Sequence, residues 1–306
     1  MNLHVTNETS TLKAVVLGQP ASMGAAPTLE QTYDAKSHET VLKNCYPKEE
    51  EISREMNAFE QVLLKYDVQV FRPWMLENCN QVFARDVGFV IDDQIINSNI
   101  IPDRNDEQAA YEVIYDLISF NKIYNLPEKA HVEGGDVVLY NDIVFVGLYS
   151  ASDYPSFKTA RTNLYAFNFL KELFPNKTFI PLELRKHDTN PRQGILHLDC
   201  AFMPIGKDKA IIYKDGFIHP SDYERVVDVF GENNLFHITQ EEMYYMNTNI
   251  FSISPQIVVT EKNFTRLNTH LEQTWGMTVE SIPYYEISKM GGLLRCSTLP
   301  LIREND

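Results

Sequence analysis

The sequence has little of what marks disulfide-bonded, zinc-ribbon or nucleic-acid-binding proteins. Its 306 residues include only four cysteines, and none of them stand in a Cys-x-x-Cys spacing. This pattern argues against a zinc ribbon and, in a reducing compartment, against structural disulfides. The formal charge is −15, and no run of Lys and Arg is present. Such a surface repels a phosphate backbone, so we expect no nucleic-acid partner.

Long apolar runs and linkers are also lacking. No stretch approaches the ~20 apolar residues that a membrane helix needs, and no basic segment leads into a signal-type apolar run. We therefore expect a cytoplasmic protein with no membrane partner. No Ser/Gly-rich linker divides the chain, and 44% hydrophobic residues suffice for a packed core. We predict a single domain over residues 1–306. The sequence does not determine whether the protein forms a homo-oligomer.

What the sequence does contain is a repeated pattern of two apolar runs around a turn, which is typical of β-hairpins. These hairpins begin near residues 87, 136, 200 and 250. Each is followed by a segment with helical periodicity, and a further short apolar run usually follows that segment. The helical segments begin at Asn105, Thr159, His219 and Asn263. The predicted unit is therefore strand, strand, helix, strand.

A fifth unit can be assembled from the two ends of the chain. LKAVVLG after Thr11 and STLPLI after Cys296 are single apolar runs without a hairpin partner. Pairing them would close the array into a ring and remove its exposed edges. We predict an α/β fold of five such units, with one open mixed sheet covered by helices on both faces as the alternative.

Chemically useful side chains stand just before each predicted hairpin. If the units are equivalent, these residues occupy equivalent places at one end of a common axis. The residues are Arg85 and Asp86, Glu133 and Asp136, His197 and Asp199, Asn247 and Asn249, and Arg295 and Cys296. Carboxylates gathered in a dry funnel are costly unless a cation compensates them, so this cluster indicates a cationic ligand.

A thiol beside a histidine is a nucleophile and an acid/base partner, and paired carboxylates suit a planar guanidinium. Nearby carboxylates raise a thiol pKa, so we predict that Cys296 is protonated in the empty site and activated by its substrate.

We expect no catalytic metal and no cofactor. His197 and Asp199 can share one side of a strand, but Cys200 should face the other, and no second His or Cys completes a site. A serine hydrolase lacks its Gly-x-Ser-x-Gly motif.

At these residues the sequence resembles the guanidino-group-modifying superfamily, which includes arginine deiminases, dimethylarginine dimethylaminohydrolases, agmatine deiminases and amidinotransferases. The motifs occur in order along nearly the whole chain. They are FARD (83–86), EGGDV (133–137), RTN (161–163), HLD (197–199) and GGLLRCSTLPL (291–301). The resemblance implies a five-unit pseudosymmetric α/β propeller.

The resemblance also implies roles for individual residues. Cys296 would attack the guanidino carbon and form a covalent S-alkylthiouronium, His197 would protonate the leaving amine and then activate water, and Glu133 would orient His197. Asp86 and Asp199 would hold the guanidinium nitrogens, and Arg161 matches a position that pairs with a substrate carboxylate. Asp136 and Arg85 complete the candidate substrate-binding set.

The implied activity is hydrolysis of the guanidino group of arginine or a close derivative, with a small cationic guanidino compound as partner. Arg295 stands where many members carry His, which leaves the leaving-group preference open. EGGD is more typical of deiminases than of amidinotransferases and favours water as the acceptor. An amidinotransferase and a guanidine-binding protein without turnover are the alternatives.

Overall fold

A computed structural model describes residues 1–304, which fold into five three-stranded sheets. Every sheet has the same order: an inner strand pairs antiparallel with a middle strand, which pairs parallel with an outer strand. The inner strands are β3 (Gly88–Ile91), β6 (Val137–Tyr140), β9 (Phe202–Ile205), β12 (Phe251–Ser254) and β15 (Thr298–Glu304). The middle strands are β4 (Gln94–Asn97), β7 (Ile143–Leu148), β10 (Lys209–Ile212), β13 (Ile257–Glu261) and β1 (Thr11–Leu17). The outer strands are β5 (Ile123–Asn125), β8 (Thr178–Glu183), β11 (Leu235–His237), β14 (Thr278–Ile282) and β2 (Gln69–Phe71).

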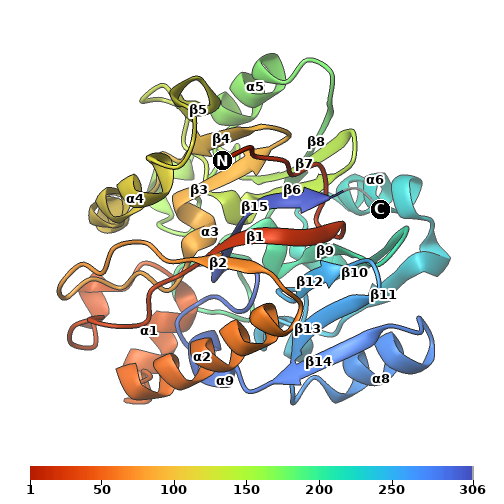
Figure 1. Ribbon diagram of the computed structural model, residues 1–306. Helices are drawn as coiled ribbons and strands as arrows, with labels where there is room; N and C mark the ends of the chain where they lie inside the picture. Colours follow the sequence, from red (N-terminus) through yellow and green to blue (C-terminus); the bar gives the residue numbers. More distant parts are fainter. Residues whose placement is uncertain (305–306) are drawn as a thin grey trace.

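The two ends of the chain supply the fifth sheet. Strand β15 pairs antiparallel with β1 from Thr11↔Glu304 to Leu17↔Thr298, as the sequence predicts. Figure 1 shows β1 beside β15 near the middle of the molecule, with the larger helices around its periphery. Strand β15 also packs on β3, and β1 packs on β12. Since residues 1–304 form five separate sheets, the alternative of one open mixed sheet is wrong.

Helices connect the middle and outer strands, and short helices lie in the loops. The α-helices are α1 (Ala35–Leu42), α2 (Glu49–Lys65), α3 (Ala84–Val87), α4 (Glu112–Tyr115), α5 (Leu164–Leu173), α6 (Pro220–Phe230), α7 (Gln240–Tyr244), α8 (Thr265–Gln273) and α9 (Tyr285–Ser288). Each of the helices within residues 1–304 is too short or too polar to traverse a bilayer.

One predicted helix has a different form. The segment that begins at Asn105 belongs mainly to a 3₁₀-helix, η2 (Pro102–Tyr111), and only its end is α-helical, in α4. A 3₁₀-helix places residues i and i+3 directly above one another and seldom runs beyond three or four residues. Here it aligns Arg104 and Glu107, whose side chains are buried and paired. The 3₁₀ winding thus buries the charged side chains of Arg104 and Glu107, which the apolar periodicity of the segment does not predict.

Strand β1 lies between two hydrophobic clusters. Leu12, Val15 and Leu17 belong to one cluster, while Ala14 and Val16 belong to the other. Alternate strand residues point to opposite faces, so one strand contributes to both. On the first side, Phe59 of α2 packs edge-on against Phe251 of β12, with ring centroids 5.7 Å apart. This packing holds the start of β12, two residues after Asn249.

Candidate active site

The polar residues before the inner strands lie in short turns at the starts of those strands. Asp86 lies in α3, and the next two turns are the 3₁₀-helices η4 (Gly134–Asp136) and η6 (Leu198–Cys200). Turn η4 contacts both α3 and η6. The structure therefore brings together side chains from different units, as their equivalent positions in the repeat predict.

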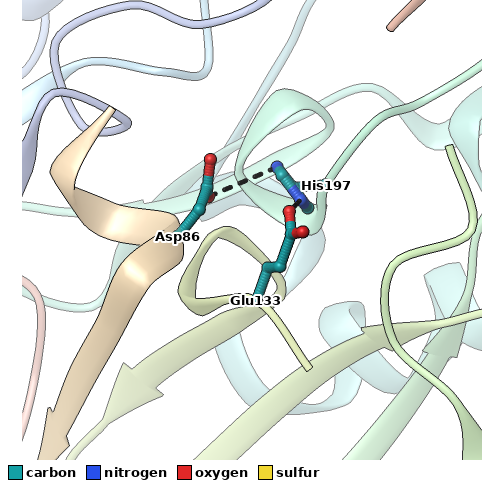
Figure 2. Close-up of side chains that lie close together, drawn as sticks. All are labelled: Asp86, Glu133 and His197. Carbon is teal, nitrogen blue, oxygen red and sulfur yellow. Dashed lines mark hydrogen bonds and ion pairs between the residues drawn. The ribbon is translucent and has the colours of Figure 1, made fainter. Parts of the chain in front are cut away.

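His197 lies between two carboxylates, as Figure 2 shows. Its Nε2 is 2.8 Å from Oε2 of Glu133, and its Nδ1 is 3.6 Å from Oδ1 of Asp86. All three side chains are buried. Burial alone lowers the pKa of His197, but the charge of Asp86 and hydrogen bonds to Cys296 and Glu133 raise it well above its ordinary value. The imidazole is therefore a cation at neutral pH and can serve as an acid.

Glu133 is ionised in this setting. Its two oxygens accept hydrogen bonds from Nη1 of Arg161 at 3.0 and 2.7 Å. Burial raises the pKa of Glu133, but Arg161 and His197 outweigh it and hold the pKa far below its ordinary range. Asp86 is bound in a similar way, since its Oδ2 lies 2.6 Å from Nη1 of Arg104. Its Oδ1 has no hydrogen-bond partner and faces the site.

The thiol of Cys296 is held by an amide and a carboxylate. Asn249 Nδ2 lies 3.1 Å from Sγ, and Asn249 Oδ1 accepts a 3.1 Å hydrogen bond from the Cys296 backbone. Asp199 Oδ2 is 3.5 Å from the sulfur. A hydrogen bond with Cys200, burial and the charge of Asp199 raise the Cys296 pKa well above its ordinary value, and His197 only partly offsets them. Without a ligand, the thiol is protonated at neutral pH.

Cys200 contradicts one expectation from the sequence. It was expected to face away from Asp199, yet its Sγ lies 3.6 Å from Asp199 Oδ1 and it interacts with Cys296. The expectation was wrong because residues 198–200 form a 3₁₀ turn rather than a strand, so their side chains do not alternate between two faces.

Arg295 belongs to a buried ionic network that includes Asp199, a neighbour of the Cys296 thiol. Its guanidinium binds Glu8 at 2.8 Å and Asp199 at 2.9 Å. Burial raises the pKa of Glu8, but Arg295 and Arg85 together lower it to about 2. Arg295 thus holds the Asp199 carboxylate, whose Oδ2 lies 3.5 Å from the sulfur of Cys296.

The remaining predicted binding residues are engaged by protein groups. Arg85 makes long contacts with the Arg295 carbonyl (3.5 Å) and the Thr298 hydroxyl (3.4 Å), and burial lowers its pKa to about 9. Asp136 accepts hydrogen bonds from Thr162 (2.7 Å) and the Leu198 backbone (2.9 Å). Direct contact of Arg85 or Asp136 with a substrate stays a prediction.

The guanidinium groups of Arg161 and Arg104 both lie near the ring of Tyr33. Their guanidinium carbons lie 5.7 and 6.0 Å from the ring centre of Tyr33, and Arg161 also donates to the Tyr33 carbonyl at 2.6 Å. Sequence reasoning missed Arg104, Tyr33 and Glu8. The only signal for Arg104 was the charged pair three residues apart in η2, and Glu8 and Tyr33 lie outside every repeated motif.

A wide hollow of about 1040 Å³ leads outward from Arg104. Its lining carries more acidic than basic side chains: Glu49, Glu50, Glu77, Asp103, Asp106 and Glu107 against Lys48 and Arg104. A cleft with this charge raises the local concentration of a cationic ligand.

Asp86, Glu133 and His197 also have the spacing of a metal-binding group, since their ligand atoms lie within 4.8 Å of one another. However, Arg104 and Arg161 already compensate the two carboxylates. This donor set is thus charge-balanced by guanidinium groups, and the absence of a metal from the reaction stays a prediction.

Comparisons with known proteins identify the family of the chain. Residues 21–303 match the family described as N,N dimethylarginine dimethylhydrolase, eukaryotic. The uncharacterised protein YkgA of Bacillus subtilis (strain 168) is 30% identical over 302 residues, covering 97% of this chain and 94% of YkgA. The arginine deiminase of Clostridium perfringens (strain SM101 / Type A) is 27% identical over 216 residues, which span 60% of this chain but only 49% of the deiminase.

Two solved structures share the fold. The N-terminal domain of ArgZ, an arginine dihydrolase from cyanobacteria, superposes with a TM-score of 0.76 at 16% identity, covering 95% of this chain and 98% of that domain. The inosamine-phosphate amidinotransferase STRB1 of Streptomyces griseus superposes with a TM-score of 0.77 at 14% identity, covering 99% of this chain and 97% of the amidinotransferase. At these identities the likeness shows the α/β architecture.

Proposed function

We propose that this chain, which belongs to the family described as N,N dimethylarginine dimethylhydrolase, eukaryotic, hydrolyses the guanidino group of arginine or a close derivative. The observation that carries the proposal is the buried His197 held between Glu133 and Asp86, next to the Cys296 thiol. This group combines a nucleophile, an acid and carboxylates that suit a guanidinium.

In the proposed first half-reaction, the Cys296 thiol gives its proton to the Asp199 carboxylate, 3.5 Å away, and the sulfur attacks the central guanidino carbon. The proton returns to the sulfur when the carbon–sulfur bond breaks in the second half-reaction. The Oδ1 of Asp86, which has no hydrogen-bond partner, and the carboxylate of Glu133 hold the guanidinium, and Asp199 assists next to the sulfur. The His197 imidazolium then gives its proton to the leaving amine, and an S-alkylthiouronium remains on Cys296. A protonated histidine at rest supports this order, because the acid is needed before the base.

In the proposed second half-reaction, neutral His197 takes a proton from water. The resulting hydroxide attacks the thiouronium carbon, and the carbon–sulfur bond breaks to release a ureido product. Glu133 stabilises the imidazolium that forms again, since its Oε2 accepts from His197 Nε2.

We also propose that the five sheets are the units of a closed pseudosymmetric α/β propeller. The common strand order of all five sheets and the β1–β15 pairing support this arrangement. It explains how residues far apart in the chain reach one axial site.

For the substrate, we propose a guanidino compound that carries a carboxylate. The resemblance gives Arg161 the role of pairing with that carboxylate, and its guanidinium carbon lies 5.7 Å from the ring centre of Tyr33, which lines the wide hollow. We therefore expect arginine or a methylated arginine to be preferred over agmatine, which lacks the carboxylate.

The test is a panel of arginine, methylated arginines and agmatine, each with and without glycine or ornithine, with products identified by mass spectrometry. A ureido product and a released amine or ammonia, unchanged by the acceptors, would support hydrolysis. An amidino group found on the acceptor would instead make the protein an amidinotransferase. Tight binding of a panel member without any product would favour a guanidine-binding protein.

A second expected result concerns the charge of the thiol. Because its neighbours raise the Cys296 pKa, we expect almost no thiolate at neutral pH in the free protein. A bound guanidinium adds a positive charge and lowers that pKa, so saturating ligand should increase the thiolate fraction. Ultraviolet titration of the wild type against Cys296→Ala isolates the signal. A thiolate fraction near unity at neutral pH without ligand would contradict substrate-assisted activation.

A further inference from the structure

Two thiols share one carboxylate in the site. Cys200 Sγ lies 3.6 Å from Oδ1 of Asp199, and Cys296 Sγ lies 3.5 Å from Oδ2 of the same side chain. Both cysteines are buried, and Cys200 is among the neighbours that raise the pKa of Cys296. A second thiol so close to a nucleophilic sulfur is not needed for guanidino hydrolysis.

The surroundings hold these two sulfurs near each other. The Thr248 hydroxyl donates a 2.8 Å hydrogen bond to the Asp199 carbonyl, and Arg295 fixes the Asp199 carboxylate at 2.9 Å. The other two cysteines lie elsewhere: Cys45 is exposed, and Cys79 lines the wide outer hollow. Cys200 is therefore the thiol placed to react with Cys296.

A small cavity reaches Cys200, the neighbour of Cys296 at Asp199. It has a volume of about 40 Å³, and its lining includes Cys200, Leu196, Met246 and Gly291. A cavity needs about 10–15 Å³ of such space to hold one water molecule, so an oxidant as small as hydrogen peroxide fits.

We propose that Cys200 is a resolving thiol that forms a reversible disulfide with Cys296 when hydrogen peroxide enters the site. The disulfide itself is inferred from the contact of both sulfurs with the Asp199 carboxylate, while its effect on activity rests on the proposed function. A bond between the two sulfurs removes the nucleophile, so oxidised protein is inactive until a thiol reductant restores it.

The atoms balance over two steps. In the first, the Cys296 sulfur attacks one peroxide oxygen and the O–O bond breaks. The thiol proton passes through Asp199 to the departing hydroxide, which leaves as water, and Cys296 becomes a sulfenic acid. In the second, the Cys200 sulfur attacks the Cys296 sulfur and the S–O bond breaks. The Cys200 proton leaves with that hydroxide as a second water, so one peroxide is reduced and two thiols are oxidised.

Cys200 also determines which product of oxidation accumulates. A sulfenic acid that meets a thiol condenses to a disulfide, whereas an isolated one is oxidised further to a sulfinic acid that ordinary thiols do not reduce. Replacing Cys200 should therefore convert a recoverable loss of activity into a permanent one.

The experiment exposes the intact protein to graded hydrogen peroxide in the presence of a metal chelator, and then blocks free thiols. Non-reducing peptide mapping identifies the modified residues. A parallel sample is treated with dithiothreitol and assayed on whichever substrate the panel identifies. Cys200→Ser and Cys200→Ala are the test variants, and Cys45→Ser, at an exposed position, is the matched control.

We expect a Cys200–Cys296 linked peptide in the wild type and in Cys45→Ser, with activity recovered by dithiothreitol. The Cys200 variants should show sulfinic acid at Cys296 and recover a several-fold smaller share of their own starting activity. Sulfinic acid at Cys296 of the wild type without the linked peptide would overturn the proposal, as would equal recovery in all variants. The peptide map needs no turnover, so it tests the disulfide even if the panel refutes the proposed function.

Discussion

Replacing Cys296 with alanine is expected to lower the rate of guanidino hydrolysis by at least about a thousandfold. Alanine cannot attack the guanidino carbon, and Cys200 is expected not to substitute for it, because the Asn249 amide supports the sulfur of Cys296 and the Cys200 thiol contacts the other Asp199 oxygen. The measurement is kcat on the substrate found in the panel, with Cys45→Ala as a control that should match the wild type.

Binding should survive the same change. The carboxylates of Asp86 and Glu133 keep their arginine partners without the thiol, so the site that binds the guanidinium stays intact. We expect the Kd of Cys296→Ala for substrate to stay within about tenfold of the wild-type KM, which is a difference of about 1.4 kcal/mol. Undiminished turnover by Cys296→Ala would remove the thiol from the mechanism.

Replacing Arg295 with methionine is expected to lower the free energy of unfolding by about 3–5 kcal/mol. The change leaves Glu8 and Asp199 buried without the guanidinium that binds both. It also removes a 2.7 Å hydrogen bond to the Val137 carbonyl, which ties the last unit to the second. Urea unfolding measures the loss directly.

A matched control lies on the same sheet. Lys13 on β1 pairs with Glu304 on β15 at 3.2 Å, but both side chains are largely exposed. Such a pair contributes about 0–1 kcal/mol, so Lys13→Met should unfold almost like the wild type. Equal stability of Arg295→Met and Lys13→Met would show that the buried network is not a stabilising feature.

The same network has a pH signature. The folded pKa of Glu8, about 2, lies below its ordinary value of 4.5, so its ionised form favours the folded state. This contribution is complete above about pH 4.5 and is lost as the pH falls toward 2. We expect Arg295→Met to lose this part of the acid dependence of stability.

Much of the fold could be predicted because local patterns repeat. The four hairpins begin where the paired apolar runs predict them. Strands β1 and β15, which have no hairpin partner of their own, pair with each other. The convergence of Asp86, Glu133, His197 and Cys296 followed from their equivalent positions in the repeat. These predictions depend on periodicity, which a sequence displays directly.

The partners of those residues could not be predicted in this way. Arg104 reaches Asp86 from a 3₁₀-helix whose apolar spacing resembles an ordinary helix, and Glu8 reaches Arg295 from a segment outside every repeat. The sequence pattern predicts the wrong side for Cys200, because residues 198–200 form a 3₁₀ turn and not a strand. Ion pairs between units depend on the three-dimensional arrangement, and no spacing along the chain encodes them.

The most direct test of the account is the covalent state of Cys296 during turnover. Wild-type protein would be mixed with the preferred substrate, carrying an isotopic label on its guanidino carbon, and quenched in acid at short times for peptide mapping. We predict that the label appears on the peptide containing Cys296 and then passes to the ureido product, and that neither species forms with Cys296→Ala. Label found on a different residue, or product formed by Cys296→Ala, would contradict the proposed mechanism.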